Sequence, residues 1–178
     1  MPGMEESLRG KLLIAAPSLF DYFRRTVVLV IEHTPDGAMG VVLNRSSETR
    51  VADAVPALAA LVEGDQLVQL GGPVSPQSVV ALGDFEDPED AGTAILGPLG
   101  VLDPEASDPP LRRLRVYAGY AGWGPGQLDA EVEQGAWIVE AASPEDPFMT
   151  GDIWSTALQR KGGRYAVLAT MPADPSLN

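Results

Sequence analysis

The stretch TVVLVIEHTPDGAMGVVLNR, residues 26–45, decides the fold. Its first eight residues are β-branched or apolar at both alternating positions, which is typical of a strand buried on both faces. TPDG then supplies type I turn residues, with Gly37 able to take a positive φ, and AMGVVLNR (residues 38–45) returns as the partner strand. The sequence therefore predicts an antiparallel hairpin at the centre of a sheet.

Further strands are predicted on both sides of this hairpin. Short apolar or alternating runs between Gly and Pro residues indicate them. They are GKLLIAA (10–16), DQLVQLGGPVSPQSVVALGDF (65–85, two strands around a turn), TAILGPLGVLDP (93–104), LRRLRVYAGYAGW (111–123), AWIVEAA (136–142) and RYAVLATM (164–171, a last or edge strand). The acidic run DFEDPED (84–90) predicts a solvated loop.

Helical spacing occurs in three places. Residues 46–64 show it but must kink or split at Pro56, and GQLDAEVEQG (126–135) fits a short helix. TGDIWSTALQRKGG (150–163) is the clearest amphipathic helix, with Thr150 or Asp152 as its cap. Because strands outnumber helices and come in consecutive runs, we expect an α+β fold. The prediction is a single domain over 1–178, with a mixed, mainly antiparallel sheet flanked by helices and a loose arm at residues 1–9.

Composition restricts the function. The 178 residues carry a formal net charge of −13 and no cysteine, which excludes disulfides, thiol nucleophiles and Cys-ligated metals. Such acidity repels phosphate backbones, so direct nucleic-acid binding is not expected. No apolar run is long enough for a membrane span, and the N-terminus lacks a signal-peptide pattern. A cytoplasmic protein without membrane association is therefore expected.

The glycine-rich stretch GYAGWGPGQLDAE (119–131) lies where a strand meets a helix. It lacks the Lys and Ser or Thr of a Walker phosphate loop, and its G-x-G-x-G spacing is not the dinucleotide fingerprint. We interpret it as a shaped turn, in which glycines supply unusual φ angles and Pro125 leads into the helix. A weaker role for the helix N-terminus in anion binding stays open.

The same stretch carries a family resemblance. Followed by GAWIVEA (135–141), it resembles the signature of the AlgH/YqgE family of bacterial proteins, as do residues 10–45, LGGPV (70–74) and the closing PSLN. The resemblance implies an α+β domain with a mixed sheet flanked by helices. It brings no established catalytic residue and no cofactor. Some members are labelled transcriptional regulators, on a pathway association more than on a DNA-binding motif.

Candidate site residues cluster around the hairpin and the glycine-rich turn. His33, the sole histidine, could act as a general base with Asn44 or an arginine as polariser, or it could bond loop backbone and hold the turn. Arg25 could clamp an anion or simply pair with surplus acids. The candidates for a binding surface are His33, Asn44, Arg45, Arg25, Tyr120, Trp123 and Gln127.

Two aromatic residues differ in their expected roles. Trp137 should pack in the core, whereas Trp123, between two glycines, should be the more exposed tryptophan and could mark a binding surface. A single histidine excludes a His-rich metal site, and DFEDPED lacks the EF-hand spacing, so no metal is expected.

Three functions follow, in order of preference. The first is a non-catalytic binding or regulatory module for a protein or small molecule. The second is a hydrolase-like enzyme using His33, and the third is a DNA-binding regulator, which lacks a helix-turn-helix signal. The sequence names no partner and no oligomeric state.

Overall fold

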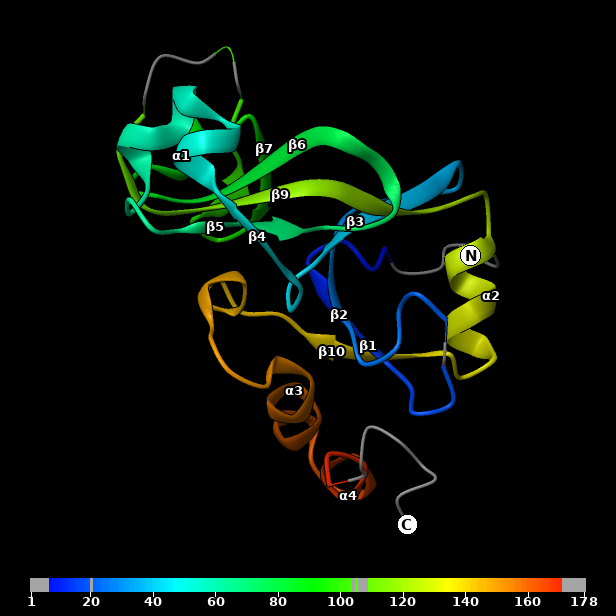
Figure 1. Cartoon of the computed structure of the whole chain (residues 1–178). Coiled ribbons are helices and arrows are strands. Elements are labelled where there is room, and N and C mark those ends of the chain that lie inside the picture. Colours follow the sequence, from blue (N-terminus) through cyan, green and yellow to red (C-terminus); the bar gives the residue numbers. More distant parts are fainter. Residues whose placement is uncertain (1–6, 20, 104, 106–108, 171–178) are drawn as a thin grey trace.

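The computed structural model describes residues 7–19, 21–103, 105 and 109–170. Eight of its strands follow one path in the order β10-β1-β2-β3-β9-β6-β8-β7. Off this path, β5 pairs with β9, and β4 pairs with β5. Figure 1 shows the two halves of this sheet, with β10, β1 and β2 below and β6, β9, β5 and β4 above. The α+β prediction of a mainly antiparallel sheet with helices is confirmed.

The predicted hairpin forms the middle of the lower half. β2 (Val27–Thr34) pairs with β3 (Gly37–Val42), and Thr34 lies opposite Gly37 across the turn. Every residue from 27 to 31 is buried, as expected for a strand covered on both faces. β1 (Lys11–Ala15) pairs with β2 on one side and with β10 (Trp137–Ala141) on the other, both antiparallel.

The upper half is built on β9 (Leu111–Trp123), whose C-terminal end also pairs with β3. β9 is antiparallel to β6 (Val74–Phe85) and parallel to β5 (Leu67–Leu70), which makes the sheet mixed. The short hairpin of β7 (Thr93–Leu96) and β8 (Leu99–Val101) completes this side.

The structure of residues 46–64 differs from the predicted kinked helix. Ser46–Arg50 forms strand β4, which pairs with β5, in place of a helix. Helical structure follows only as α1 (Val51–Ala54) and the 3₁₀ helix η1 (Pro56–Leu61), with Pro56 at the start of the second piece. The polar run SSETR has β-strand partners available on β5, and that pairing outweighs its weak helical spacing.

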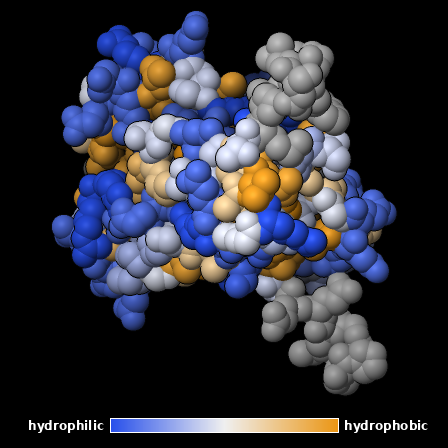
Figure 2. All heavy atoms as spheres, turned by 90° about the horizontal axis from the view of Figure 1, so that it is seen from below, coloured by the Kyte–Doolittle hydropathy of each residue, from blue (hydrophilic) through white to orange (hydrophobic). Residues whose placement is uncertain are grey.

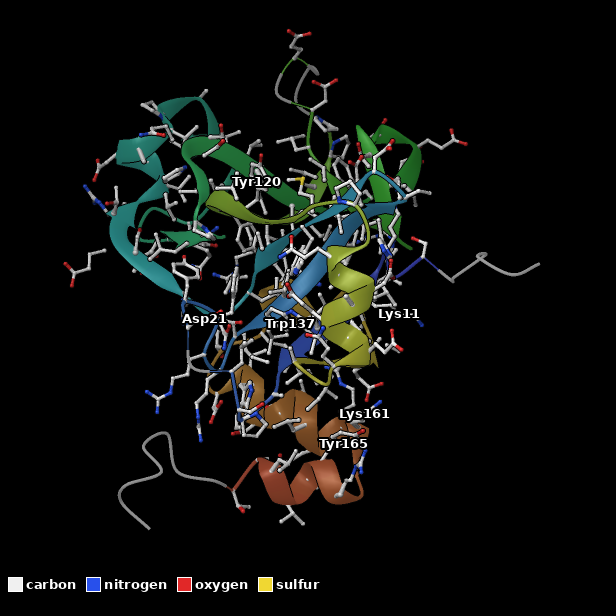
Figure 3. All side chains as sticks on the ribbon, turned by 90° about the vertical axis from the view of Figure 1, so that its right-hand side faces the viewer. Lys11, Asp21, Tyr120, Trp137, Lys161 and Tyr165 are labelled. Carbon is white, nitrogen blue, oxygen red and sulfur yellow. The ribbon has the colours of Figure 1, made fainter. Side chains whose placement is uncertain are left out.

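The predicted last strand at residues 164–171 is also wrong. Arg164–Leu168 is helix α4 and not a strand, and Met171 lies outside the described residues. Gly162 and Gly163 both have positive φ, so the chain turns sharply after α3 (Ile153–Lys161). α4 then packs on α3, with the Lys161 Nζ 5.2 Å from the Tyr165 ring centroid. Figure 3 shows these two side chains together at the lower end of the molecule.

The acidic run 84–90 corrects a third prediction in part. Asp84 belongs to β6 and is only 5% exposed, because it pairs with Arg112 at 3.3 Å and Arg113 at 2.8 Å. Phe85 also belongs to β6 and is fully buried. Only the residues after it turn through the 3₁₀ helix η2 (Pro88–Asp90), where the Asp87 carboxylate accepts the Glu89 N–H. Arg112 and Arg113 on β9 neutralise the Asp84 carboxylate, which allows this one acid of the run to be buried in the sheet.

Helices cover both faces of the lower sheet. α2 (Gln127–Glu133) packs through Leu128 on the face that holds Leu13, Val28 and Val30. α3, preceded by the 3₁₀ helix η3 (Asp146–Phe148), covers the opposite face. The Asp152 carboxylate caps α3 by accepting the Ser155 N–H, as predicted. A third core cluster lies under α1 and η1.

Glycines of two sequence blocks pack against each other. A Cβ on Gly71 would lie 2.3 Å from the Gly119 carbonyl oxygen, and one on Gly72 would lie 2.1 Å from Tyr120 backbone. Gly119 itself has φ of +74°. Before it, Tyr117 of β9 packs in the cluster on the α3 side of the sheet, and after it Tyr120 does, so the strand changes face at this glycine. Gly71 and Gly72 therefore allow two backbone segments to pack closely, and Gly119 allows β9 to change the face that its side chains point to.

The face seen from below, where α3 and α4 lie, is mainly hydrophilic with small hydrophobic groups (Figure 2). No helix among the described residues is long and apolar enough to cross a membrane.

Candidate functional site

The seven candidate residues occupy three separate places. His33, Trp123 and Gln127 lie where the hairpin turn meets α2, whereas Arg25, Asn44 and Arg45 lie at the opposite end of β2. Val27 and His33, which mark these ends, are six residues apart, or about 20 Å along an extended strand. Tyr120 is half-buried on β9, opposite Val74. One common surface does not contain them all.

His33 has both ring nitrogens engaged. Nδ1 accepts the backbone N–H of Leu8 at 2.9 Å, and Nε2 lies 3.3 Å from Oδ1 of Asp129 on α2. The side chain is 8% exposed. The Ser7 hydroxyl also donates to the His33 carbonyl, so residues 7–9 of the expected loose arm are attached to β2, and residues 1–6 lie outside the described part. His33 joins three segments and leaves no nitrogen for a substrate.

The glycine-rich turn is held by a hydrogen-bond network. The Gln127 side chain accepts the Gly124 N–H at 2.9 Å and donates to Glu131 at 2.8 Å. The indole N–H groups of Trp123 and Trp137 both donate to Oε1 of Glu131, at 3.1 and 3.0 Å. Gly126, with φ of +72°, is the N-cap residue that directly precedes α2. The interpretation as a shaped turn explains every one of these contacts.

Trp123 is more buried than the sequence indicated. It is 7% exposed, because Phe23 stacks on it with centroids 6.4 Å apart and Trp137 meets it edge-on at 6.0 Å. The expectation of an exposed Trp123 is therefore wrong, while that of a core Trp137, 3% exposed, is confirmed. Figure 3 shows Trp137 beside α2, with Tyr120 farther up on the sheet.

Asn44 stabilises the loop that precedes β2. Its Oδ1 accepts the Val27 N–H at 3.0 Å, and its Nδ2 donates to the Arg25 carbonyl at 2.8 Å. Arg25 has φ of +56°, a conformation that side-chain-bearing residues rarely adopt. The Asn44 amide holds the chain in this conformation from both sides.

The arginines at this end also make contacts within the chain. The Arg25 guanidinium lies 4.3 Å from the Trp154 ring centroid, and that indole donates to the Ala15 carbonyl at 2.8 Å. Arg45 lies 4.7 Å from the Tyr22 ring centroid and donates to the Arg24 carbonyl. Neither arginine is a simple surface charge, since each rests on an aromatic ring.

Asp152 lies near this end, at the cap of α3. Partial desolvation acts to raise its pKa, but hydrogen bonds from the Ser155 hydroxyl and N–H, together with the Arg25 charge, prevail and lower the pKa below its ordinary value. The carboxylate is therefore ionised at neutral pH and already occupied.

A cavity of about 250 Å³ opens beside Asn44, and we call it the Asn44 cavity. It is bounded by the end of β3, by β4, β5 and β9, and by the segment leading into α3. Its lining residues are Leu43, Asn44, Ser46, Gln69, Arg115, Pro147, Met149, Thr150, Gly151 and Ile153. None of them is acidic.

Sequence reasoning missed Arg115 and Gln69. A usable signal was present, because Arg115 alternates with the buried Leu114 and Val116 and shares its strand face with Tyr117. An arginine that shares a strand face with a buried tyrosine is expected to be partly buried, whereas most arginines lie in solvent. Gln69 is paired with Tyr117 across β5 and β9, which the sequence could not reveal.

A second cavity, of about 270 Å³, lies at the turn end of the hairpin. Its polar lining includes Glu32, Thr34 and Asp36, with Trp123 and Met39 beside them, and His33 is not among its lining residues. Among the described residues no group of three or more His, Asp or Glu side chains could hold a metal ion.

The comparisons with known proteins agree with one another. A family model described as AlgH-like matches residues 12–166. A UPF0301 protein of Streptomyces coelicolor is 41% identical over 194 residues, with all of both chains covered. A UPF0301 protein of Thermobifida fusca is 42% identical over 190 residues, covering 97% of this chain and 96% of that protein.

Two solved structures share the fold. The crystal structure of protein DIP2367 from Corynebacterium diphtheriae has a TM-score of 0.83 at 33% identity, covering 96% of this chain and 95% of that one. The solution structure of the AlgH protein from Pseudomonas aeruginosa has a TM-score of 0.71 at 28% identity, covering 97% and 96%. With the family model spanning most of its length, this chain belongs to the AlgH-like family.

Proposed function

We propose that this protein is a non-catalytic binding module that holds a small molecule in the Asn44 cavity. The observation that carries the proposal is the cavity itself, a surface pocket whose lining includes polar side chains and which lies next to a loop held by Asn44. Concave sites with a few placed polar groups are the usual sites of small-ligand binding.

The engagement of the candidate catalytic groups supports binding over catalysis. Both His33 nitrogens and both ends of the Asn44 amide have partners within the chain. A general base needs a free nitrogen within reach of a substrate proton, and its polariser must lie beside it. His33 and Asn44 lie at opposite ends of β2, which argues against Asn44 as the polariser in the hydrolase alternative.

Native mass spectrometry of the gently purified full chain tests this proposal, with a denatured sample for comparison. Thr150→Trp places an indole at the cavity wall from an exposed position, and Thr156→Trp makes the same change on the exposed side of α3, away from the cavity. We expect a non-covalent additional mass on the wild type and Thr156→Trp, and none on Thr150→Trp. A bare wild-type chain, or the same mass on Thr150→Trp, would overturn the proposal.

A further inference from the structure

We propose that the Asn44 cavity binds an oxyanion, the carboxylate or phosphate group of a small molecule, through the guanidinium of Arg115. This inference rests on the proposed function and adds the chemical class of its ligand. It is carried by the hydrogen-bonding state of the groups around the cavity.

Arg115 differs from the other arginines of its strand. Arg112 pairs with Asp84, and Arg113 pairs with both Asp84 and Glu145. Across residues 7–19, 21–103, 105 and 109–170, the Arg115 guanidinium has no hydrogen bond and no ion pair, although the side chain is half-buried. A guanidinium carries five donors and no acceptor, so its partial burial favours a partner that offers acceptors.

Tyr117 shows the same shortage of acceptors on this strand face. It lies two residues beyond Arg115, is fully buried, and its hydroxyl has no hydrogen-bond partner. Burial raises the pKa of Tyr117 above its ordinary value, although the nearby Arg115 charge acts to lower it, so the phenol stays a protonated donor. Tyr117 is not among the lining residues of the cavity, so its hydroxyl does not contact a molecule there; on the cavity wall, the donor group without an acceptor is the Arg115 guanidinium.

The remaining polar groups on the wall are largely occupied by backbone. The Ser46 hydroxyl donates to the Ser47 carbonyl, and the Gln69 amide donates to the Leu67 carbonyl. Asn44 is held by the loop before β2. Arg115 is therefore the principal source of donors for a molecule in the cavity.

The charge that lines this cavity is opposite in sign to the net charge of the chain. Asp and Glu number 25 against 12 Lys and Arg, yet the lining has one cation and no acid. The flanking Asp152 is bonded to Ser155 and lies near the Arg25 charge. An anion therefore finds a local electrostatic attraction at this cavity, in spite of the net negative charge of the chain.

Size restricts the ligand further. A volume of about 250 Å³ is below the usual range for drug-sized molecules, roughly 300–1,000 Å³. The cavity thus fits a small metabolite with one or two acidic groups better than a nucleotide.

Arg115 also borders a third cavity, of about 360 Å³, which Ala60, Glu63, Arg112 and Arg113 help to line and which we call the Ala60 cavity. Glu63 places a carboxylate on that wall, and its other two arginines are already paired, Arg112 with Asp84 and Arg113 with Asp84 and Glu145. These charges favour the Asn44 cavity as the anion site, and the two cavities can be blocked separately.

The test is a titration of the ¹⁵N-labelled full chain with sodium phosphate and, separately, with sodium succinate, at constant ionic strength set with sodium chloride. Amide shifts of Gln69 and Gly151 report on the cavity. We expect saturable shifts with at least one anion, and about ten- to hundredfold weaker binding in Arg115→Gln, the loss typical of one charged hydrogen-bond partner. Arg112→Gln, the same change on a paired arginine of β9, should bind like the wild type.

Blocking variants locate the site. Thr150→Trp should abolish the shifts, and Ala60→Trp, which obstructs the Ala60 cavity from an exposed position, should retain them. Response to phosphate alone assigns a phosphoryl ligand, and response to succinate alone assigns a carboxylate. No saturable shift with either anion, or unchanged affinity in Arg115→Gln, would overturn the inference. If native mass spectrometry still shows a mass that Thr150→Trp removes, the proposed function stands and only the ligand class is wrong.

Discussion

Replacing Asn44 by alanine should destabilise the protein strongly, because the amide has a structural role. The change removes the acceptor of the Val27 N–H, a residue that is 0% exposed, and the donor to the Arg25 carbonyl. Leaving a buried backbone group without its partner costs about 1–3 kcal/mol. For the two bonds together we expect a loss of roughly 2–5 kcal/mol, which lowers the melting temperature by about 5–15 °C for a chain of this size.

Urea unfolding followed by tryptophan fluorescence measures this loss, since Trp154 lies against Arg25. Asn44→Asp is the matched control: it keeps an acceptor for Val27 but loses the donor to Arg25, so it should lose about half as much free energy of unfolding. An Asn44→Ala protein within about 0.5 kcal/mol of the wild type, the range of ordinary surface changes, would refute the structural role and return Asn44 to the list of ligand-binding residues.

Three further predictions concern other polar contacts. Tyr117→Phe should raise the free energy of unfolding by about 1 kcal/mol in urea titrations, because it removes a buried hydroxyl without a partner; a loss of stability would show that the hydroxyl is bonded. The folded-state pKa of Asp152 is lowered, so its contribution should be present above the unfolded pKa near 3.8 and be lost as pH falls through the folded value; the stability difference between wild type and Asp152→Asn should therefore shrink between pH 5 and about pH 3. Glu131→Ala should cost about 1–3 kcal/mol, because it removes the acceptor of both the Trp123 and Trp137 indoles, and Glu131→Gln should cost less; equal losses in thermal unfolding would contradict the shared acceptor.

The parts of the fold that follow from local pattern could be predicted from the sequence. The hairpin at 26–45 and helix 153–161 have strong periodicity and specific turn or cap residues, and both form as expected. Residues 46–50 were mispredicted because their strand exists only through pairing with β5, which is distant in the chain. Asp84 was likewise placed in a loop, because the arginines that hold it lie on β9.

The candidate site divides in the same way. Residue type drew attention to His33, Asn44 and Trp123, but the partners that occupy their polar atoms come from Leu8, Arg25 and Glu131 and were not visible in the pattern. Arg115 was interpreted as surface charge, because an arginine on a strand looks solvated until the neighbours on its face are known. Arg115 is distinguished by hydrogen-bond donors that have no acceptor, and this property can be recognised only once the positions of the neighbouring residues are known.

A crystal structure of the full chain, purified and crystallised without added phosphate, sulfate or carboxylate buffers, tests the central claim most directly. We expect ligand density in the Asn44 cavity, with an oxyanion at hydrogen-bond distance from the Arg115 guanidinium. A cavity that holds only water, with the guanidinium turned onto a carboxylate of the chain such as Glu63, would contradict it.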